Sequence, residues 1–178
     1  MPAYPNLDAL LQRALGEDPS DHFRKHVIPY LLEIWIANYK QQSPGAEIVE
    51  TTQEQSSYLF DTVGQRLIAA WRISGGRHPH QRDTKRAKKH PMSAGPEYHR
   101  GHAISHRLGG RNDINLVPQR GKINNGAFKK LETMAVKTPG ALYYTYWMYG
   151  DSESQTPVSV EQALLVPGEK PKFSIQGN

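Results

Sequence analysis

The spacing of apolar residues predicts that the chain begins with helices. Between residues 6 and 16, and again between 21 and 41, apolar side chains recur every three or four positions, as they do on one face of an α-helix. Pro29 interrupts the second stretch. Because proline has no N–H and clashes with the preceding turn, we predict a kink or a new helix start there. The Ser43-Pro44-Gly45 sequence indicates where the helical part ends.

After residue 45 the pattern becomes that of an α+β protein. Gly64 is predicted to supply the positive φ of a hairpin turn. One more helix is predicted over 121–137, with Phe128, Leu131 and either Met134 or Ala135 facing inward. The chain end is predicted to be a frayed end or an edge strand. The predicted strands are 47–51, 58–62, 66–73, 98–105, 114–118, 142–149 and 158–166.

Composition excludes several classes of protein. The chain has 178 residues, which favours a single domain, and it has no cysteine. Disulfide scaffolds, thiolate zinc sites, iron–sulfur clusters and cysteine nucleophiles are therefore excluded. The mean hydropathy is −0.68, and no apolar run approaches 18 residues, so no membrane span is expected. The first residues show no basic start, apolar centre or small-residue cleavage site, so no Sec signal peptide is expected.

Positive charge is concentrated in the middle of the chain. Nine basic residues lie between Arg72 and Arg107 against two acidic ones, a local charge of +7, whereas the whole chain carries +5. Such a local field favours a surface that faces nucleic-acid phosphates. Most of this charge falls in 74–96, which is predicted to be a long functional loop. Its Lys88 and Lys89 are predicted to bind the substrate backbone without reading bases.

Residues 98–132 contain the residues best suited to catalysis. The predicted strands carry Arg100 and His102, then Asn115 and Gln119, with Gly109-Gly110 turning the chain between them. The predicted helix carries Asn124 and Glu132, about 2.2 turns apart, so both can face one side. A histidine, an amide and a carboxylate beside a basic strand suit metal-assisted attack on a phosphodiester. In such a reaction the histidine deprotonates water and arginine neutralises phosphate charge.

Three motifs in this stretch resemble the DNA/RNA non-specific endonucleases, which are ββα-metal (His-Me finger) nucleases. They are His99-Arg100-Gly101-His102, then Asn115-Leu116-Val117-Pro118-Gln119, then Ile123-Asn124-Asn125-Gly126 ending at Leu131-Glu132. The run after His102 and the hairpin containing Gly64 look most like compact bacterial toxin-type members. The resemblance covers about 57–137. It implies a ββα-metal core at 98–137, with antiparallel strands, within a nuclease domain at 46–178 that follows a helical N-terminal extension at 1–45.

The resemblance also implies a role for each matching residue. His102 would be the general base, and Asn124 would be the direct protein ligand of Mg²⁺ or another hard divalent cation such as Mn²⁺. Glu132 would hold a metal-bound water, while Arg100 would contact phosphate. Asn115 and Gln119 would support the site. The expected catalytic set is His102, Arg100, Glu132 and Asn115, and the expected substrate-binding set is Arg107, Gln119, Lys88 and Lys89.

The resemblance leaves the biological role open. The simplest expectation is a toxin or effector nuclease that acts on DNA, with RNA as a second candidate substrate. Such a protein would be cytoplasmic or carried into a target cell by a dedicated secretion system, and a cognate immunity protein would be a further partner. An intracellular housekeeping or defence nuclease is the alternative. A nucleic-acid-binding module that has lost activity is a third reading, because His99 stands where the family has aspartate.

An aromatic stripe in the predicted strand 142–149 has two interpretations. It could stack on bases, but alternating aromatic residues on a strand more often pack in the core, which is the reading we favour. The stripe consists of Tyr143, Tyr144, Tyr146, Trp147 and Tyr149.

Overall fold

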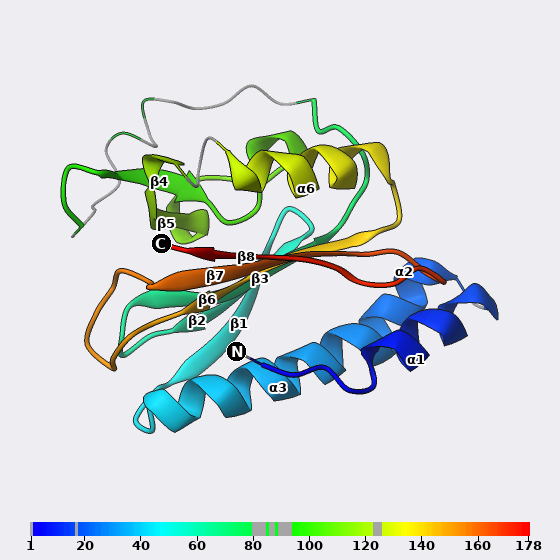
Figure 1. Cartoon of the computed structure of the whole chain (residues 1–178), viewed down its shortest axis with the longest axis horizontal. Coiled ribbons are helices and arrows are strands. Elements are labelled where there is room, and N and C mark those ends of the chain that lie inside the picture. Colours follow the sequence, from blue (N-terminus) through cyan, green and yellow to red (C-terminus); the bar gives the residue numbers. More distant parts are fainter. Residues whose placement is uncertain (1, 17, 80–84, 86–87, 89–93, 123–125) are drawn as a thin grey trace.

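The computed structural model describes residues 2–16, 18–79, 85, 88, 94–122 and 126–178. Helices at the start of the chain cover one face of a large antiparallel sheet, and a hairpin and a further helix cover the other face (Figure 1). The α+β fold predicted from the sequence is therefore confirmed.

The large sheet has six strands in the order β1-β2-β3-β6-β7-β8, and all neighbours are antiparallel. The chain end forms the edge strand β8, one of the two outcomes that the sequence predicted. The six strands are β1 Ile48–Gln53, β2 Ser56–Asp61, β3 Arg66–Ile73, β6 Leu142–Met148, β7 Ser159–Leu165 and β8 Lys172–Gly177.

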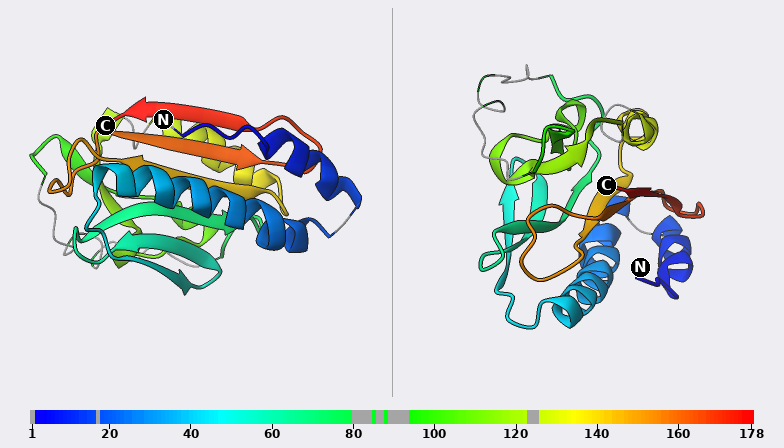
Figure 2. Two further views of the ribbon diagram at one scale, coloured as in Figure 1. Left: turned by 90° about the horizontal axis from the view of Figure 1, so that it is seen from below. Right: turned by 60° about the vertical axis from the view of Figure 1, so that its left-hand side comes forward.

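The N-terminal helices break where the sequence predicted. Helix α3 (Ile28–Gln42) starts beside Pro29, whose missing N–H costs nothing in the first turn. A π-helical turn, η2 (Phe23–Val27), precedes it and joins it to the short helix α2 (Pro19–His22). Helix α1 (Leu7–Arg13) and the 3₁₀ turn η1 (Ala14–Gly16) lie next to α3 on the same side of the sheet (Figure 2).

Strand β6 packs against both layers that cover the sheet, because its side chains alternate between the two faces. Trp35 of α3 lies 4.9 Å edge-on from Tyr144 and 5.8 Å stacked from Tyr146, measured between ring centroids. On the opposite face, Trp147 stacks on Phe128 of α6 (Ala127–Lys137) at 6.0 Å. All five residues of the aromatic stripe are buried, so the core interpretation is confirmed.

The hairpin between β2 and β3 differs from the prediction at its turn. The residue with positive φ is Gln65 (φ 50°), so the role assigned to Gly64 is wrong. Gly64 is needed for a different reason, since a Cβ at this position would lie 2.6 Å from Oδ2 of Asp61. The Asp61 carboxylate folds over the turn and accepts a hydrogen bond from the Val63 N–H at 3.0 Å.

The N-terminal helices belong to the same hydrophobic core as the sheet. Leu11, Phe23, Val27 and Leu31 are fully buried in one cluster with residues of β3, β6 and β7. The division of the chain at residues 45 and 46 stays a prediction. In the part of the chain that the structure describes, no helix is long and apolar enough to cross a bilayer.

Candidate active site

The site is built on a two-stranded antiparallel sheet formed by β4 (Tyr98–His102) and β5 (Leu116–Arg120). β4 stops three residues short of the predicted strand, and β5 begins and ends two residues later than predicted. The hairpin lies on the same side of the large sheet as α6 (Figure 1). Because side chains alternate along a strand, Tyr98, Arg100 and His102 share one face of β4, and His99 and Gly101 share the other.

Gly101 is required by the side chain that lies across it. A Cβ on Gly101 would lie 2.1 Å from Oε1 of Gln119, so only glycine leaves room for this amide. Gln119 is completely buried, and neither polar atom of its side chain has a hydrogen-bond partner among the described residues. We predicted that Gln119 would bind substrate. Its burial rules out a direct contact in this conformation, and it supports the hairpin from the face opposite His102.

His102 has a fixed ring orientation. Its side chain is 8% exposed, and Nε2 lies 3.1 Å from Oδ1 of Asn112. An amide oxygen only accepts, so Nε2 carries the proton and donates it to Asn112, which leaves the lone pair on Nδ1. Asn112 is a residue that sequence reasoning missed. It directly follows Gly109-Gly110-Arg111, and a polar residue next to a turn between two site-bearing strands is the only signal it gives.

Asn115 holds together the loop that joins the two strands. Its Oδ1 accepts from the Ile104 N–H at 2.7 Å, and its Nδ2 donates to the carbonyls of Ile104 (2.8 Å) and Arg111 (2.7 Å). It lies in the 3₁₀ turn η4 (Asp113–Asn115) and is fully buried. Its predicted place on the strand is therefore wrong, whereas its place in the catalytic set stays a prediction. Its bonds fit the supporting role that the resemblance implied.

The turn inside this loop allows no side chain at one of its glycines. A Cβ on Gly110 would lie 1.8 Å from the Ile104 carbonyl oxygen. Gly109 adopts φ 89°, the left-handed region that L-residues avoid. The predicted Gly-Gly turn is therefore confirmed, with one glycine needed for its backbone conformation and the other for space.

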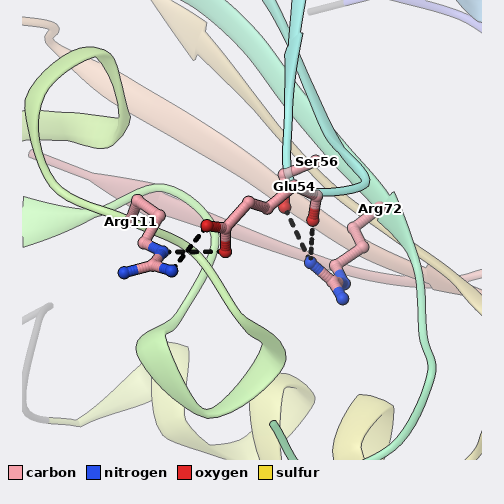
Figure 3. A network of polar contacts seen from close by, with 4 residues as sticks. All are labelled: Glu54, Ser56, Arg72 and Arg111. Atoms are coloured by element: carbon pink, nitrogen blue, oxygen red, sulfur yellow. Dashed lines mark hydrogen bonds and ion pairs between the residues drawn. The ribbon is translucent and has the colours of Figure 1, made fainter. Parts of the chain in front are cut away.

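The same loop is tied to the large sheet by a network of charged residues (Figure 3). Arg111 donates to the Glu54 carboxylate through Nε at 2.8 Å and Nη2 at 2.5 Å. Arg72 of β3 is buried, and its Nη1 donates to the Glu54 carbonyl at 2.8 Å and to Ser56 Oγ at 3.2 Å. The β1–β2 turn thus connects a cation in the sheet to Arg111, the neighbour of Asn112.

Helix α6 presents Glu132 on the side that faces the hairpin loop. Burial raises the pKa of the Glu132 carboxyl from 4.5 to about 7, although the positive charges of Arg107 and Lys129 oppose this shift. Arg107 lies in the 3₁₀ turn η3 (His106–Leu108), which packs against α6, and its Nη1 donates to Oγ1 of Thr133 at 3.3 Å. The structure therefore brings Glu132 and Arg107 close enough for their charges to interact.

For the remaining predicted site residues, the structure gives only the burial of two and does not describe the other two. Arg100 is half-buried on the His102 face of β4, and Lys88 is exposed. Asn124, the predicted metal ligand, and Lys89 lie outside the described residues, as does most of the predicted loop 74–96.

The carboxylate oxygens of Glu132 are ligands that suit a hard cation. Its carboxylate forms no hydrogen bond or ion pair with any residue in the described ranges, and burial makes its negative charge costly. A cation or a cation-bound water would relieve that cost. Within the same ranges, no three His, Cys, Asp or Glu side chains gather as a metal site. One desolvated carboxylate is the kind of group that holds a water of a hydrated Mg²⁺ ion.

A histidine on a two-stranded hairpin, with a carboxylate-bearing helix on the same side of a larger sheet, defines a ββα-metal nuclease fold. The sequence matches the family model described as DNA/RNA non-specific endonuclease over residues 38–161. The chain therefore belongs to this family and is a nuclease, a hydrolase of phosphodiester bonds.

Solved structures show the same fold. NucA from Streptococcus agalactiae with no metal bound gives a TM-score of 0.54 at 14% identity, over 82% of this chain and 89% of that one. Its form with a magnesium ion bound gives 0.50 at 13%, over 82% and 88%. The EndoG/EndoGI complex gives 0.51 at 14%, over 81% and 80%. No curated protein matches the sequence.

Proposed function

We propose that this protein is a metal-dependent endonuclease that cleaves DNA, and RNA as well, with little sequence preference. The observation that carries the proposal is the buried His102, whose Nε2 is engaged by Asn112 on a strand face shared with Arg100. In that arrangement Nδ1 is the nitrogen that can take a proton from water. Contacts to phosphate carry no base information, which is why sequence preference is expected to be weak.

Each side chain has a distinct task in the proposed reaction. His102 removes a proton from the attacking water, and Asn112 stabilises the resulting imidazolium because its amide oxygen accepts from Nε2–H. Arg100 and Arg107 neutralise the phosphate and the charge that develops as the new P–O bond forms. Asn115 and Gln119 take no part in proton transfer, because both are fully buried.

We propose that Asn124 and Glu132 hold the cation, Asn124 directly and Glu132 through a bound water. NucA from Streptococcus agalactiae has been solved with a magnesium ion bound, which supports Mg²⁺, with Mn²⁺ as a substitute. When bound, such an ion polarises phosphoryl oxygens and stabilises the leaving oxygen. Glu132 is suited to this task because its carboxylate is desolvated and accepts no hydrogen bond from the described residues.

Cleavage of supercoiled plasmid and of a matched RNA, with Mg²⁺ and with EDTA, tests the proposal. The wild type is expected to cut only with Mg²⁺. His102→Ala and Asn124→Ala are expected to lose cleavage while binding labelled DNA and melting as the wild type does. Glu33→Gln, on the exposed face of α3, is the matched control and is expected to cut normally. Cleavage by wild type in EDTA, or normal cleavage by His102→Ala, would refute the mechanism.

The biological role we propose is that of a toxin or effector nuclease, delivered into a target cell and neutralised in the producing cell by an inhibitor protein. The toxin-type motifs after His102 support this role, and the structure of EndoG with EndoGI shows that one protein of this fold is held by an inhibitor. Co-expression tests it. Wild-type protein should stop growth of the host unless the neighbouring open reading frame is expressed with it, whereas His102→Ala should be harmless.

The structure bears on the reading that the site has lost activity. His99, in place of the family aspartate, lies on the face of β4 opposite His102. It is exposed and packs beside Gly121, where a Cβ would lie 2.9 Å from the His99 ring. The substitution therefore leaves the bonding of His102 to Asn112 intact, and we propose an active enzyme.

A further inference from the structure

An aromatic residue and an arginine are paired at the end of the β4–β5 hairpin farthest from His102. Tyr98 and Arg120 are cross-strand partners in the register of the two strands. The guanidinium carbon of Arg120 lies 5.6 Å from the centroid of the Tyr98 ring, and Arg120 Nε donates to Tyr98 Oη at 3.4 Å. The pair thus places a positive charge beside a partly exposed aromatic ring.

This pair continues the line of the active site. Tyr98, Arg100 and His102 occupy alternate positions on one face of β4, so they form a row from an aromatic ring through a cation to the imidazole. Four residues of antiparallel strand span about 14 Å. That length equals about four nucleotides of a strand stacked at about 3.4 Å each, and fewer nucleotides of an extended single strand. A nucleic-acid strand whose scissile phosphate lies at His102 can therefore run along β4 and reach Tyr98.

Arg120 is positioned but still able to bind a ligand. Its backbone N–H donates to Oδ1 of Asn178 at 2.9 Å, and Asn178 Nδ2 donates to the Pro118 carbonyl at 2.9 Å, which fixes the end of β5. The Arg120 side chain is exposed. Within the described part of the chain, the hydrogen bond to Tyr98 is its only one, which leaves both Nη groups available. Glu97 is the acidic residue whose charge acts on it.

We propose that Tyr98 and Arg120 form a substrate subsite, a few nucleotides from the scissile phosphate, where an unpaired base stacks on the Tyr98–Arg120 pair and Arg120 contacts a phosphate. This inference rests on the proposed nuclease function. Stacking on an aromatic ring tolerates every base, so the subsite adds affinity without adding sequence preference. It makes cleavage efficiency depend on the length of the substrate.

Two substrates of different length test the subsite. The first is a 20-nucleotide single-stranded DNA, and the second is bis(p-nitrophenyl) phosphate, which is too small to reach Tyr98 from His102. For Arg120→Gln and Tyr98→Ala, the ratio of kcat/KM on the oligonucleotide to that on the small diester is expected to fall roughly five- to hundredfold, through KM. Tyr98→Phe keeps the ring and is expected to retain most of this ratio.

Binding gives a second readout that does not depend on turnover. In the His102→Ala background, Arg120→Gln is expected to weaken binding of the labelled oligonucleotide, and to reduce the slope of log K against log salt by about 0.7, the value for one phosphate contact on a single strand. Glu97→Gln should act in the opposite direction and tighten binding, because it removes a negative charge near Arg120. Arg13→Gln, on the exposed side of α1, changes the net charge equally and is expected to have little effect.

The outcomes separate this inference from the function on which it rests. Equal losses on both substrates would mean that Tyr98 and Arg120 only stabilise the hairpin, and would overturn the subsite. An unchanged oligonucleotide KM and an unchanged salt slope would overturn it too. Failure of the wild type to cut any nucleic acid with Mg²⁺ would instead refute the proposed function, while the binding measurement would still decide whether the pair contacts nucleic acid.

Discussion

Nε2 of His102 and Oδ1 of Asn112 are 3.1 Å apart, although they are ten residues apart in sequence and the 3₁₀ turn η3 lies between them. The bond selects one tautomer of the imidazole and one orientation of its ring. The proton-accepting role proposed for His102 therefore depends on the conformation of the loop between β4 and β5, which positions Asn112.

We expect Asn112→Ala to lower kcat by about 10- to 100-fold, which is typical when a partner that orients a functional histidine is removed. Asn112→Asp should act differently, because a carboxylate beside the ring favours the imidazolium form. Since the proposed base must be neutral, the rise of kcat with pH should move to higher pH in Asn112→Asp. Rate profiles from pH 5 to 10 measure both effects. A pH profile identical to that of the wild type would contradict the assigned bond.

Glu132 should make the metal-free protein less stable as the pH rises. Burial raises its pKa in the folded state from 4.5 to about 7, so the folded protein binds more protons than the unfolded chain between these values. The free energy of unfolding therefore falls as the pH increases from about 4.5 to about 7. Glu132→Gln removes this penalty and should be the more stable protein at pH 8.5, by up to about 3 kcal/mol for a shift from 4.5 to about 7.

Thermal melting in EDTA at pH 4 and pH 8.5 checks the Glu132 prediction. The two proteins should melt together at pH 4, where the wild-type carboxyl is neutral as well. At pH 8.5 the variant should have the higher Tm, and in a separate assay with Mg²⁺ it should show no nuclease activity. A lower Tm for Glu132→Gln at pH 8.5 would show that the carboxylate is stabilised by a protein partner.

The Glu54–Arg111 pair should matter more for activity than for stability. Both side chains are 43% exposed, and exposed ion pairs contribute about 0.2–1 kcal/mol to folding. Their bond nevertheless ties the loop carrying Asn112 to the β1–β2 turn, so Glu54→Gln and Arg111→Gln should each reduce kcat by about tenfold, the lower end of the losses typical of orienting partners.

A double-mutant cycle isolates the Glu54–Arg111 interaction. If the pair acts through its bond, the Glu54→Gln/Arg111→Gln double variant should lose no more activity than either single variant. Independent, multiplying losses would mean that the two residues act separately. Lys172→Gln, which removes a similar exposed ion pair with Glu169 on the edge of the large sheet, is the matched control and should leave kcat unchanged.

Gly101 and Gln119 should show strong coupling in stability. Gly101→Ala places a Cβ where the Gln119 amide lies, and a fully buried side chain cannot move aside freely. We expect Gly101→Ala to cost about 1–3 kcal/mol, as overpacking does elsewhere. Adding Gln119→Ala should recover most of this loss, because it empties the contested space. Urea denaturation of the four proteins measures the coupling, and additive effects would contradict the packing described.

Sequence alone predicted the fold class and most of the elements, because these depend on local patterns. Apolar periodicity gave the helices and strands, and Pro29 gave the helix start, since a missing N–H acts within one turn. The Gly64 prediction failed because the reason for that glycine is a contact with the Asp61 carboxylate rather than its own φ. In a sequence, a glycine that is needed for its positive φ cannot be distinguished from a glycine that is needed because there is no space for a Cβ.

The parts of the site that sequence did not predict depend on contacts made by folding. Asn112 carries no motif, and its role follows from the path of the loop around Asn115. Gln119 is polar and was expected to contact substrate. In the structure its side chain is buried instead, because it occupies the space that Gly101 leaves by having no Cβ. Glu54 and Arg111 are 57 residues apart in sequence and meet only because the β1–β2 turn reaches the loop.

The double-sided packing of β6 means that the catalytic layer and the N-terminal helices depend on each other. Trp35 covers Tyr144 and Tyr146, and Phe128 of the site-bearing helix covers Trp147 on the reverse side of the same strand. Removing the first 45 residues would uncover a row of aromatic rings, and such a surface promotes aggregation. An inhibitor that loosened α3 would therefore inactivate the enzyme without contacting the residues of the proposed active site.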